Sequence, residues 1–107
     1  MREMTNTSAI TLYEDVLQEM VERTTSFYLE QGMSLYTNKK YENALPFFES
    51  AYQYAPNDPE IIYHLARIYH NLNDLEQAKE LYNILIEKHQ DSARSQEAQT
   101  YLGYIKQ

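Results

Sequence analysis

The chain has 107 residues, enough for one compact domain but too few for two hydrophobic cores of ordinary size. Two glycines, three prolines and no cysteine or tryptophan favour an all-α protein, and the lack of cysteine excludes a disulfide framework and thiolate chemistry. The net charge is -7, and no basic cluster exceeds Lys39 and Lys40. This balance excludes nucleic acid as the expected partner, because affinity for phosphates depends on clustered Lys and Arg.

Neither a signal peptide nor a membrane span is expected from the sequence. The N-terminal residues contain no continuous apolar stretch, and Glu14 and Asp15 follow early. Nowhere does the chain contain the run of about 18 apolar residues that a bilayer requires. The sequence therefore predicts a soluble, cytoplasmic protein without membrane insertion.

The first predicted helix covers about residues 9–23 and carries an apolar stripe. Its members recur at helical spacing and are Ile10, Tyr13, Val16, Leu17, Met20 and Val21. The run Thr24-Thr25-Ser26 offers a helix cap, which favours a break before the next helix, although one long helix is the alternative. The stripe is expected to bury itself against the rest of the chain or against a second copy of it.

Four further helices follow in the middle of the chain. They are expected at about 26–38, 41–54, 59–71 and 75–88. Pro46 lies close enough to the start of its helix to remove only one early hydrogen bond. Pro56 ends that helix, Asp58 caps the next one, and Pro59 occupies its first position.

The last predicted helix covers about residues 92–106, with Asp91 or Ser92 as its cap. It contains Leu102 and Gly103, and it is expected to cover the apolar face that the preceding helices leave open.

The sequence matches itself when it is shifted by about 34 residues, a distance here called one repeat length. One repeat length covers two helices and the turn between them. The matched pairs preserve residue type: Tyr28 with Ile62, Gly32 with Ala66, Leu35 with Tyr69, Tyr41 with Leu75, Ala44 with Ala78, Phe48 with Tyr82, and Ala51 with Leu85. Small residues at such positions allow two helix backbones to approach closely, and larger ones fill the space around them. We expect Gly32, Ala44, Ala51, Ala66, Ala78 and also Gly103 to be packing positions.

This pattern resembles the tetratricopeptide repeat, a helix-turn-helix unit of about 34 residues. The first copy carries the aromatic, small and large positions of the family as Tyr28, Gly32, Leu35, Tyr41, Ala44, Phe48, Ala51 and Pro56, with Gln31 in place of the usual leucine. The second copy departs at Leu85 and Gln90. The last helix resembles the first helix of a further repeat, shifted by three residues, of the form seen in bacterial envelope repeat proteins.

The resemblance implies a single α-solenoid domain over residues 1–107. We expect an N-terminal extension and capping helix over 1–24, repeat one over 25–58, repeat two over 59–92, and a C-terminal capping helix over 93–107.

In such a solenoid the first helix of each pair lines a concave groove, where members of the family bind proteins. The residues expected to face the groove and bind a partner peptide or helix are Leu29, Met33, Tyr36, Tyr63, Arg67, His70 and Asn71. Some family members grip acidic tails with a clamp of Lys, Asn and Arg. That clamp is missing here, because its positions are occupied by Leu29, Met33, His64, Glu97 and Tyr101.

The sequence therefore favours a non-enzymatic adaptor, with no cofactor and no metal. No catalytic motif occurs, and His64, His70 and His89 are too scattered to share a metal ion. Two alternatives stay open. One is a structural unit whose amphipathic terminal helices pair in a homodimer, and the other is a small chaperone of the secretion type, which also places an N-terminal helix ahead of such repeats.

Overall fold

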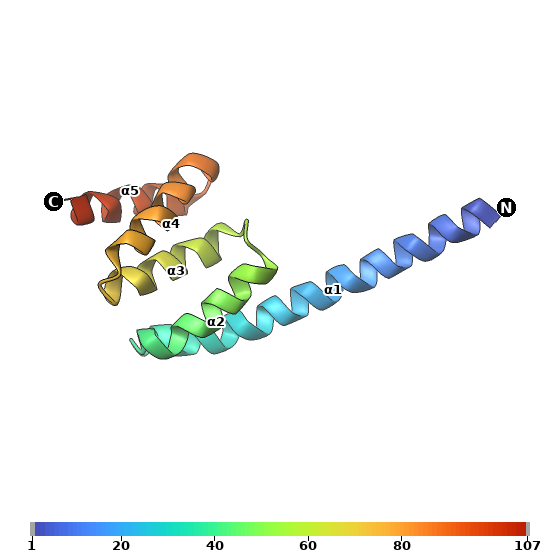
Figure 1. Cartoon of the computed structure of the whole chain (residues 1–107), viewed down its shortest axis with the longest axis horizontal. Coiled ribbons are helices and arrows are strands. Elements are labelled where there is room, and N and C mark those ends of the chain that lie inside the picture. The colour runs from blue at the N-terminus through green and yellow to red at the C-terminus, as the bar shows by residue number, and fades with distance from the viewer. Residues whose placement is uncertain (1, 107) are drawn as a thin grey trace.

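The computed structural model describes the backbone of residues 2–106 and the side chains of residues 10–105. This part of the chain forms five helices and no strand, so the prediction of an all-α fold is confirmed. The helices are α1 (Arg2–Thr37), α2 (Tyr41–Tyr54), α3 (Pro59–Asn71), α4 (Leu75–Lys88) and α5 (Ala93–Lys106). They pack as antiparallel neighbours, while the N-terminal half of α1 projects from the body as a rod (Figure 1).

The expected break near residue 24 is wrong, because α1 is one uninterrupted helix of 36 residues. The Thr25 hydroxyl does not cap a new helix but donates a hydrogen bond of 2.8 Å to the carbonyl of Val21, one turn back. No proline or glycine precedes Gly32, so nothing in this stretch of the sequence interrupts the backbone ladder. Repeat one therefore shares its first helix with the N-terminal extension.

The turns inside the two helix pairs lie one repeat length apart and have the same geometry. Lys39 and Asn73 both adopt the left-handed conformation, with φ of 60° and 66°. In each turn the next amide reaches back across the helix end, from Lys40 to Leu35 and from Asp74 to Tyr69, both at 2.9 Å. The repeat in the amino-acid sequence is thus also a repeat of backbone conformation.

The proline and cap predictions for the middle of the chain are confirmed. Pro46 lies inside α2, which continues unbroken to Tyr54 just before Pro56. The Asp58 carboxylate accepts a hydrogen bond of 2.9 Å from the amide of Glu60, and Pro59 begins α3.

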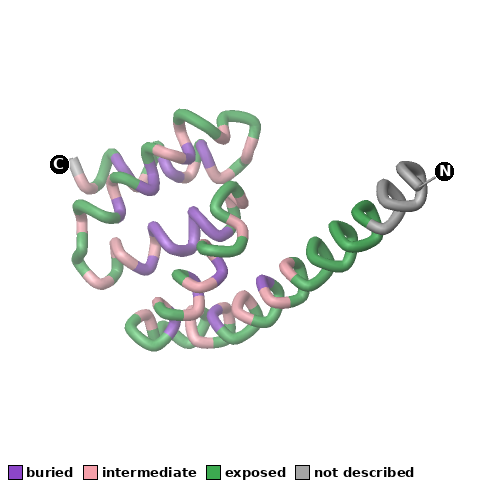
Figure 2. Tube along the Cα trace, turned by 45° about the vertical axis from the view of Figure 1, so that its right-hand side comes forward, coloured by how far each residue is buried: buried purple, intermediate pink, exposed green. Residues whose placement is uncertain are grey.

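The small residues of the repeats lie in the core. Ala44, Ala51, Ala66 and Ala78 have no exposed surface. A Cβ placed on Gly32 would lie 2.8 Å from Cε2 of Phe48, so glycine is required for α1 and α2 to approach this closely. Buried residues gather in α3 and on the helices around it (Figure 2).

Helix α5 occupies the position of a third first helix, and its register corrects two predictions. It begins at Ala93, one full repeat length after Pro59, so the expected shift of three residues is wrong. Gly103 is not a packing glycine, since nothing lies within 4 Å of a Cβ placed on it.

The two sides of α5 differ sharply in burial. Ser95, Ala98 and Leu102 are buried, as are their counterparts one repeat length earlier, Ile61, His64 and Ile68. The residues that correspond to the side of α3 expected to pack within its own pair are exposed instead: Gln96, Gln99, Thr100 and Gly103. Helix α5 therefore covers the apolar core with one side and leaves a polar outer face.

None of the helices within residues 2–106 is both long enough and apolar enough to cross a bilayer.

Candidate functional site: the inner face of the first helices

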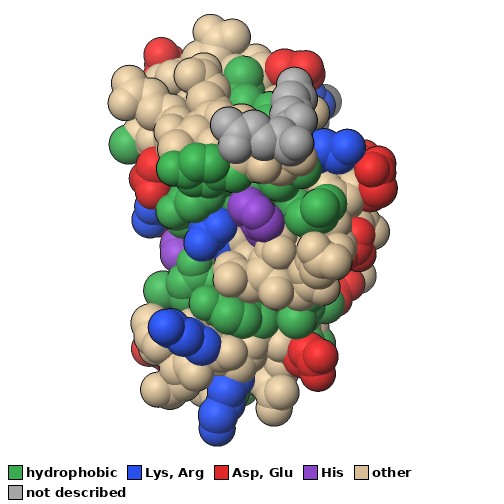
Figure 3. Space-filling model, turned by 90° about the vertical axis from the view of Figure 1, so that its left-hand side faces the viewer, with side chains coloured by type: hydrophobic (Ala, Val, Ile, Leu, Met, Phe, Trp, Pro, Cys, Tyr) green, Lys and Arg blue, Asp and Glu red, His purple; other side chains and the backbone are tan. Residues whose placement is uncertain are grey.

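The seven residues expected to line the groove come from α1 and α3 and differ in exposure. Leu29, Met33 and Tyr36 of α1 are partly buried, as are Arg67 and His70 of α3, whereas Asn71 is exposed. Tyr63 is only 6% exposed, so it supports this face from below and offers little surface of its own. Seen from the left-hand side of Figure 1, the surface of the molecule has hydrophobic side chains around a histidine and basic side chains (Figure 3).

A stack of rings joins α1 to α3 at the centre of this face. His64 is buried, and its Nδ1 lies 2.8 Å from the carbonyl of Glu60, which must accept the bond from it. Tyr36 meets the His64 ring edge-on at 5.1 Å, and Phe48 stacks on the imidazole at 5.7 Å. Burial lowers the pKa of His64, because the charged imidazolium is poorly solvated there. The imidazole therefore acts as a neutral part of the core.

Arg67 is held in the middle of the face by aromatic neighbours. Its guanidinium carbon lies 3.8 Å from the centre of the Tyr101 ring, a cation-π contact between α3 and α5. One guanidinium nitrogen donates to Nδ1 of His70 at 3.3 Å, and the Tyr82 hydroxyl lies 3.2 Å from the same atom. His70 Nδ1 therefore accepts both bonds, and burial followed by the Arg67 charge lowers the pKa of His70. Burial also raises the pKa of Tyr82 to about 12.

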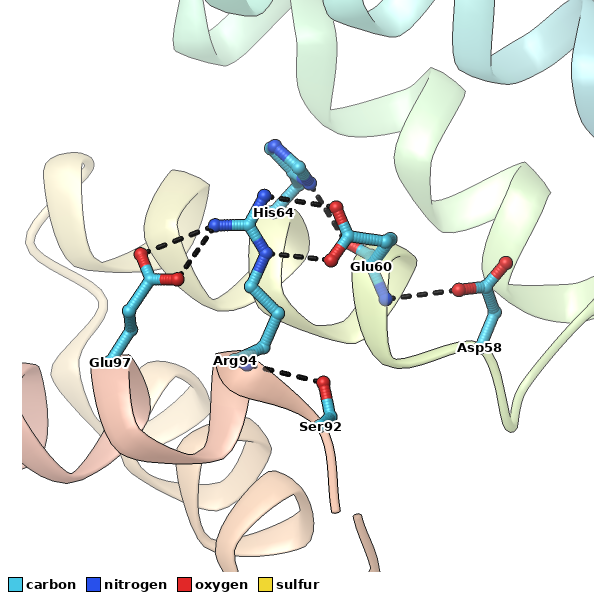
Figure 4. A network of polar contacts seen from close by, with 6 residues as sticks. All are labelled: Asp58, Glu60, His64, Ser92, Arg94 and Glu97. Carbon is cyan, nitrogen blue, oxygen red and sulfur yellow. Dashed lines mark hydrogen bonds and ion pairs between the residues drawn. The ribbon is translucent and has the colours of Figure 1, made fainter. Parts of the chain in front are cut away.

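Arg94 of α5 bonds Glu60 at the start of α3 and also Glu97 on its own helix (Figure 4). Its guanidinium donates two bonds to Glu60, at 2.6 and 2.9 Å, and another to Glu97 at 2.9 Å. It also covers the Tyr63 ring, with 4.1 Å between the guanidinium carbon and the ring centre. The hydrogen bonds from Arg94 lower the pKa of Glu60, which keeps this carboxylate charged. Two carboxylates at the edge of the face are thus paired with one arginine within the chain.

A hollow of about 340 Å³ extends the inner face toward the rod. Leu29 is the one residue of the predicted set that lines it. Its other lining residues are Gln18, Val21, Glu22, Thr25, Ser26, Tyr54, Ala55 and Asp58. Apolar and polar groups of α1 therefore meet the end of α2 and the cap of α3 at this point.

The structure adds a third triplet to the predicted groove set, in which Glu97 and Tyr101 were considered only as clamp positions and Tyr104 was not considered. Glu97, Tyr101 and Tyr104 lie on α5, one repeat length after Tyr63, Arg67 and His70. Tyr101 packs against Tyr82, His70 and Tyr63, at ring distances of 6.0, 6.1 and 6.4 Å. The repeat interval continued without a shift places Tyr104 beside Glu97 and Tyr101 in this triplet.

The described side chains contain no group of three or more His, Asp or Glu residues that could hold a metal ion.

Comparison with known proteins agrees with this geometry. The sequence profile described as tetratricopeptide repeat matches residues 35–102, which is more than half of the chain. No curated protein and no solved structure matches the chain. The repeated turns, the buried small residues and the profile match together show that the chain belongs to the tetratricopeptide repeat family.

Proposed function

We propose that the inner face binds a peptide or helix of a partner protein, and that the chain acts as a non-enzymatic adaptor. Repeats of this family are generally protein-protein interaction modules. The face proposed here consists of three triplets: Leu29, Met33 and Tyr36 from α1; Tyr63, Arg67 and His70 from α3 with Asn71 beside them; and Glu97, Tyr101 and Tyr104 from α5.

The unpaired charge of Arg67 carries this proposal. Among the described side chains, Arg67 contacts rings and an imidazole, but no carboxylate forms an ion pair with it. Arg94, by contrast, is fully engaged by Glu60 and Glu97. A partner carboxylate or carbonyl beside an apolar or aromatic side chain would match a cation set among tyrosines.

Panning a phage library of random 15-residue peptides against the chain tests this proposal. We expect enriched peptides to combine an acidic residue with apolar or aromatic residues. Arg67→Met keeps the length of the side chain and removes its charge, so we expect it to weaken these peptides about 10-fold or more. Arg23→Met on the rod is the matched control and should bind as the original chain does. Equal binding by both variants, or no enrichment at all, would refute the proposal.

A second candidate function is pairing of two copies through α1. It is favoured by the apolar side chains that the rod leaves exposed, including Ile10, Leu17 and Met20. Sedimentation equilibrium over a range of concentrations tests it, since a chain that stays monomeric throughout does not pair.

A further inference from the structure

Five of the seven exposed large apolar residues in the described part of α1 lie on one continuous seam. Six positions follow a spacing of three and four residues in strict alternation: Ile10, Tyr13, Leu17, Met20, Thr24 and Phe27. This is the spacing of the a and d positions of a coiled coil. The five apolar members are each between 43% and 67% exposed. The seam continues past the rod through Thr24, which is partly buried, to Phe27, which is exposed.

The charges around the seam favour a protein partner over a lipid or nucleic acid surface. The rod carries carboxylates at Asp15, Glu19 and Glu22, and Arg23 is the one basic residue between residues 10 and 37. Amphipathic helices that bind anionic membranes have basic polar faces instead. An apolar strip at coiled-coil spacing with an acidic reverse side therefore fits another helix.

We infer that this helix is α1 of a second copy, running antiparallel across a two-fold axis between Leu17 and Met20. This inference rests on the second candidate function and specifies its register. Ile10 would then lie opposite the second copy's Phe27, Tyr13 opposite its Thr24, and Leu17 opposite its Met20. All six seam positions of each copy find a partner in this register, and the interface is self-complementary as a two-fold axis requires.

Side-chain size selects this orientation over the parallel one. A parallel pair would place Tyr13 against Tyr13 and Phe27 against Phe27, yet Thr24 against Thr24. The Tyr13 and Phe27 layers would be overfilled and the Thr24 layer underfilled. The antiparallel register sets the small Thr24 against the large Tyr13, and every layer receives a similar total volume. It also places the two acidic bodies at opposite ends of the helix pair, beyond the range of strong repulsion.

The area available is that of a small, specific interface. The five apolar members of the seam and Val16 beside them are all exposed. They offer about 600 Å² per copy if each contributes about 100 Å². This is at the lower end for specific complexes, so we expect a monomer-dimer equilibrium in the micromolar range.

Sedimentation equilibrium between about 1 and 300 µM tests the pairing itself. We expect a dimer fraction that rises with concentration. Met20→Glu places a charge at the centre of the seam and should abolish the dimer. Leu12→Glu is the matched control, because Leu12 is 66% exposed on the same rod but lies off the seam. A monomer at every concentration, or equal loss of the dimer in both variants, would overturn the inference and the second candidate together.

Cysteine cross-linking tests the register, and the chain has no native cysteine to interfere. In the antiparallel pair, an introduced thiol at position 13 lies opposite position 24 of the second copy, while equal positions are about 16 Å apart along the axis. We expect a mixture of Tyr13→Cys and Thr24→Cys to form a mixed disulfide on oxidation, and each variant alone to form little or none. Efficient disulfides within each variant alone would overturn the antiparallel register while leaving the second candidate standing.

Discussion

The two halves of α1 are parts of one helix with very different surroundings. Residues 10–24 lie almost entirely in solvent, whereas residues 25–37 carry the glycine and aromatic contacts that hold α2. The exposed half relies on its backbone ladder and on local pairs such as Gln18 with Glu22 at 3.1 Å and Arg23 with Glu19 at 2.5 Å. Such pairs contribute only about 0.2–0.5 kcal/mol each to a helix. The two halves of α1 therefore have the same secondary structure but depend on tertiary packing to different extents.

The sharpest way to break this comparison is to truncate one phenylalanine that packs on the second half of α1 and one that α1 leaves exposed. Phe48 has no exposed surface and packs against Gly32, whereas Phe27 is 55% exposed. We expect Phe48→Ala to reduce the free energy of unfolding by about 3–5 kcal/mol, through the lost burial and the cavity left behind. Phe27→Ala should change it by less than about 0.5 kcal/mol in the monomer. Urea unfolding followed by circular dichroism measures both, and similar losses would contradict the packing described for α1.

The two glycines offer an intermediate effect with opposite signs. Alanine at position 32 must displace the Phe48 ring, and we expect a loss of about 1–3 kcal/mol. Alanine at position 103 meets open space in a helix, so Gly103→Ala should stabilise the chain by about 0.5–1 kcal/mol. Thermal melts monitored by circular dichroism compare the two. A stabilised Gly32→Ala variant would mean that α1 and α2 do not approach as closely as the structure has them.

The smallest expected effect distinguishes the two arginines that form ion pairs, Arg94 and Arg23. The Arg94 side chain is 26% exposed and bridges two helices, while the Arg23 side chain is 78% exposed and pairs within its own turn. We expect Arg94→Met to cost about 1 kcal/mol and to speed hydrogen exchange in α5. Arg23→Met should cost no more than about 0.3 kcal/mol. Unchanged exchange in α5 would show that Arg94 does not hold this helix in place.

Much of the fold followed from residue type at fixed spacing. The small residues Ala44 and Ala78 were identifiable because only a close helix contact demands a small side chain twice at an interval of one repeat length. Asp58 and Pro59 set the start of α3 by local chemistry that needs no tertiary context. Features of this kind are readable because the cause lies within a few residues of the effect.

The predictions that were wrong or incomplete concern features whose cause lies in contacts between helices. The run of Thr24 and Thr25 could cap a helix or continue one, and the Thr25 hydroxyl bonds the carbonyl one turn back. The Leu102-Gly103 pair predicts a packing glycine, but only Leu102 of the two is buried, together with Ser95 and Ala98. His64 and Tyr101 entered the inner face through ring contacts between helices. Which of several helix faces meets another element is decided by the whole array.

The polar outer face of α5 is poorly suited to the stacking of a further helix pair. Stacking adds one helix pair to another only where an apolar side awaits it, and Gln96, Gln99 and Thr100 supply amides and a hydroxyl instead. Replacing those few side chains with leucine and alanine would give the outer face of α5 the apolar surface that a further helix pair could pack against. Stacking a further helix pair on α5 would therefore require a change of surface chemistry rather than of fold.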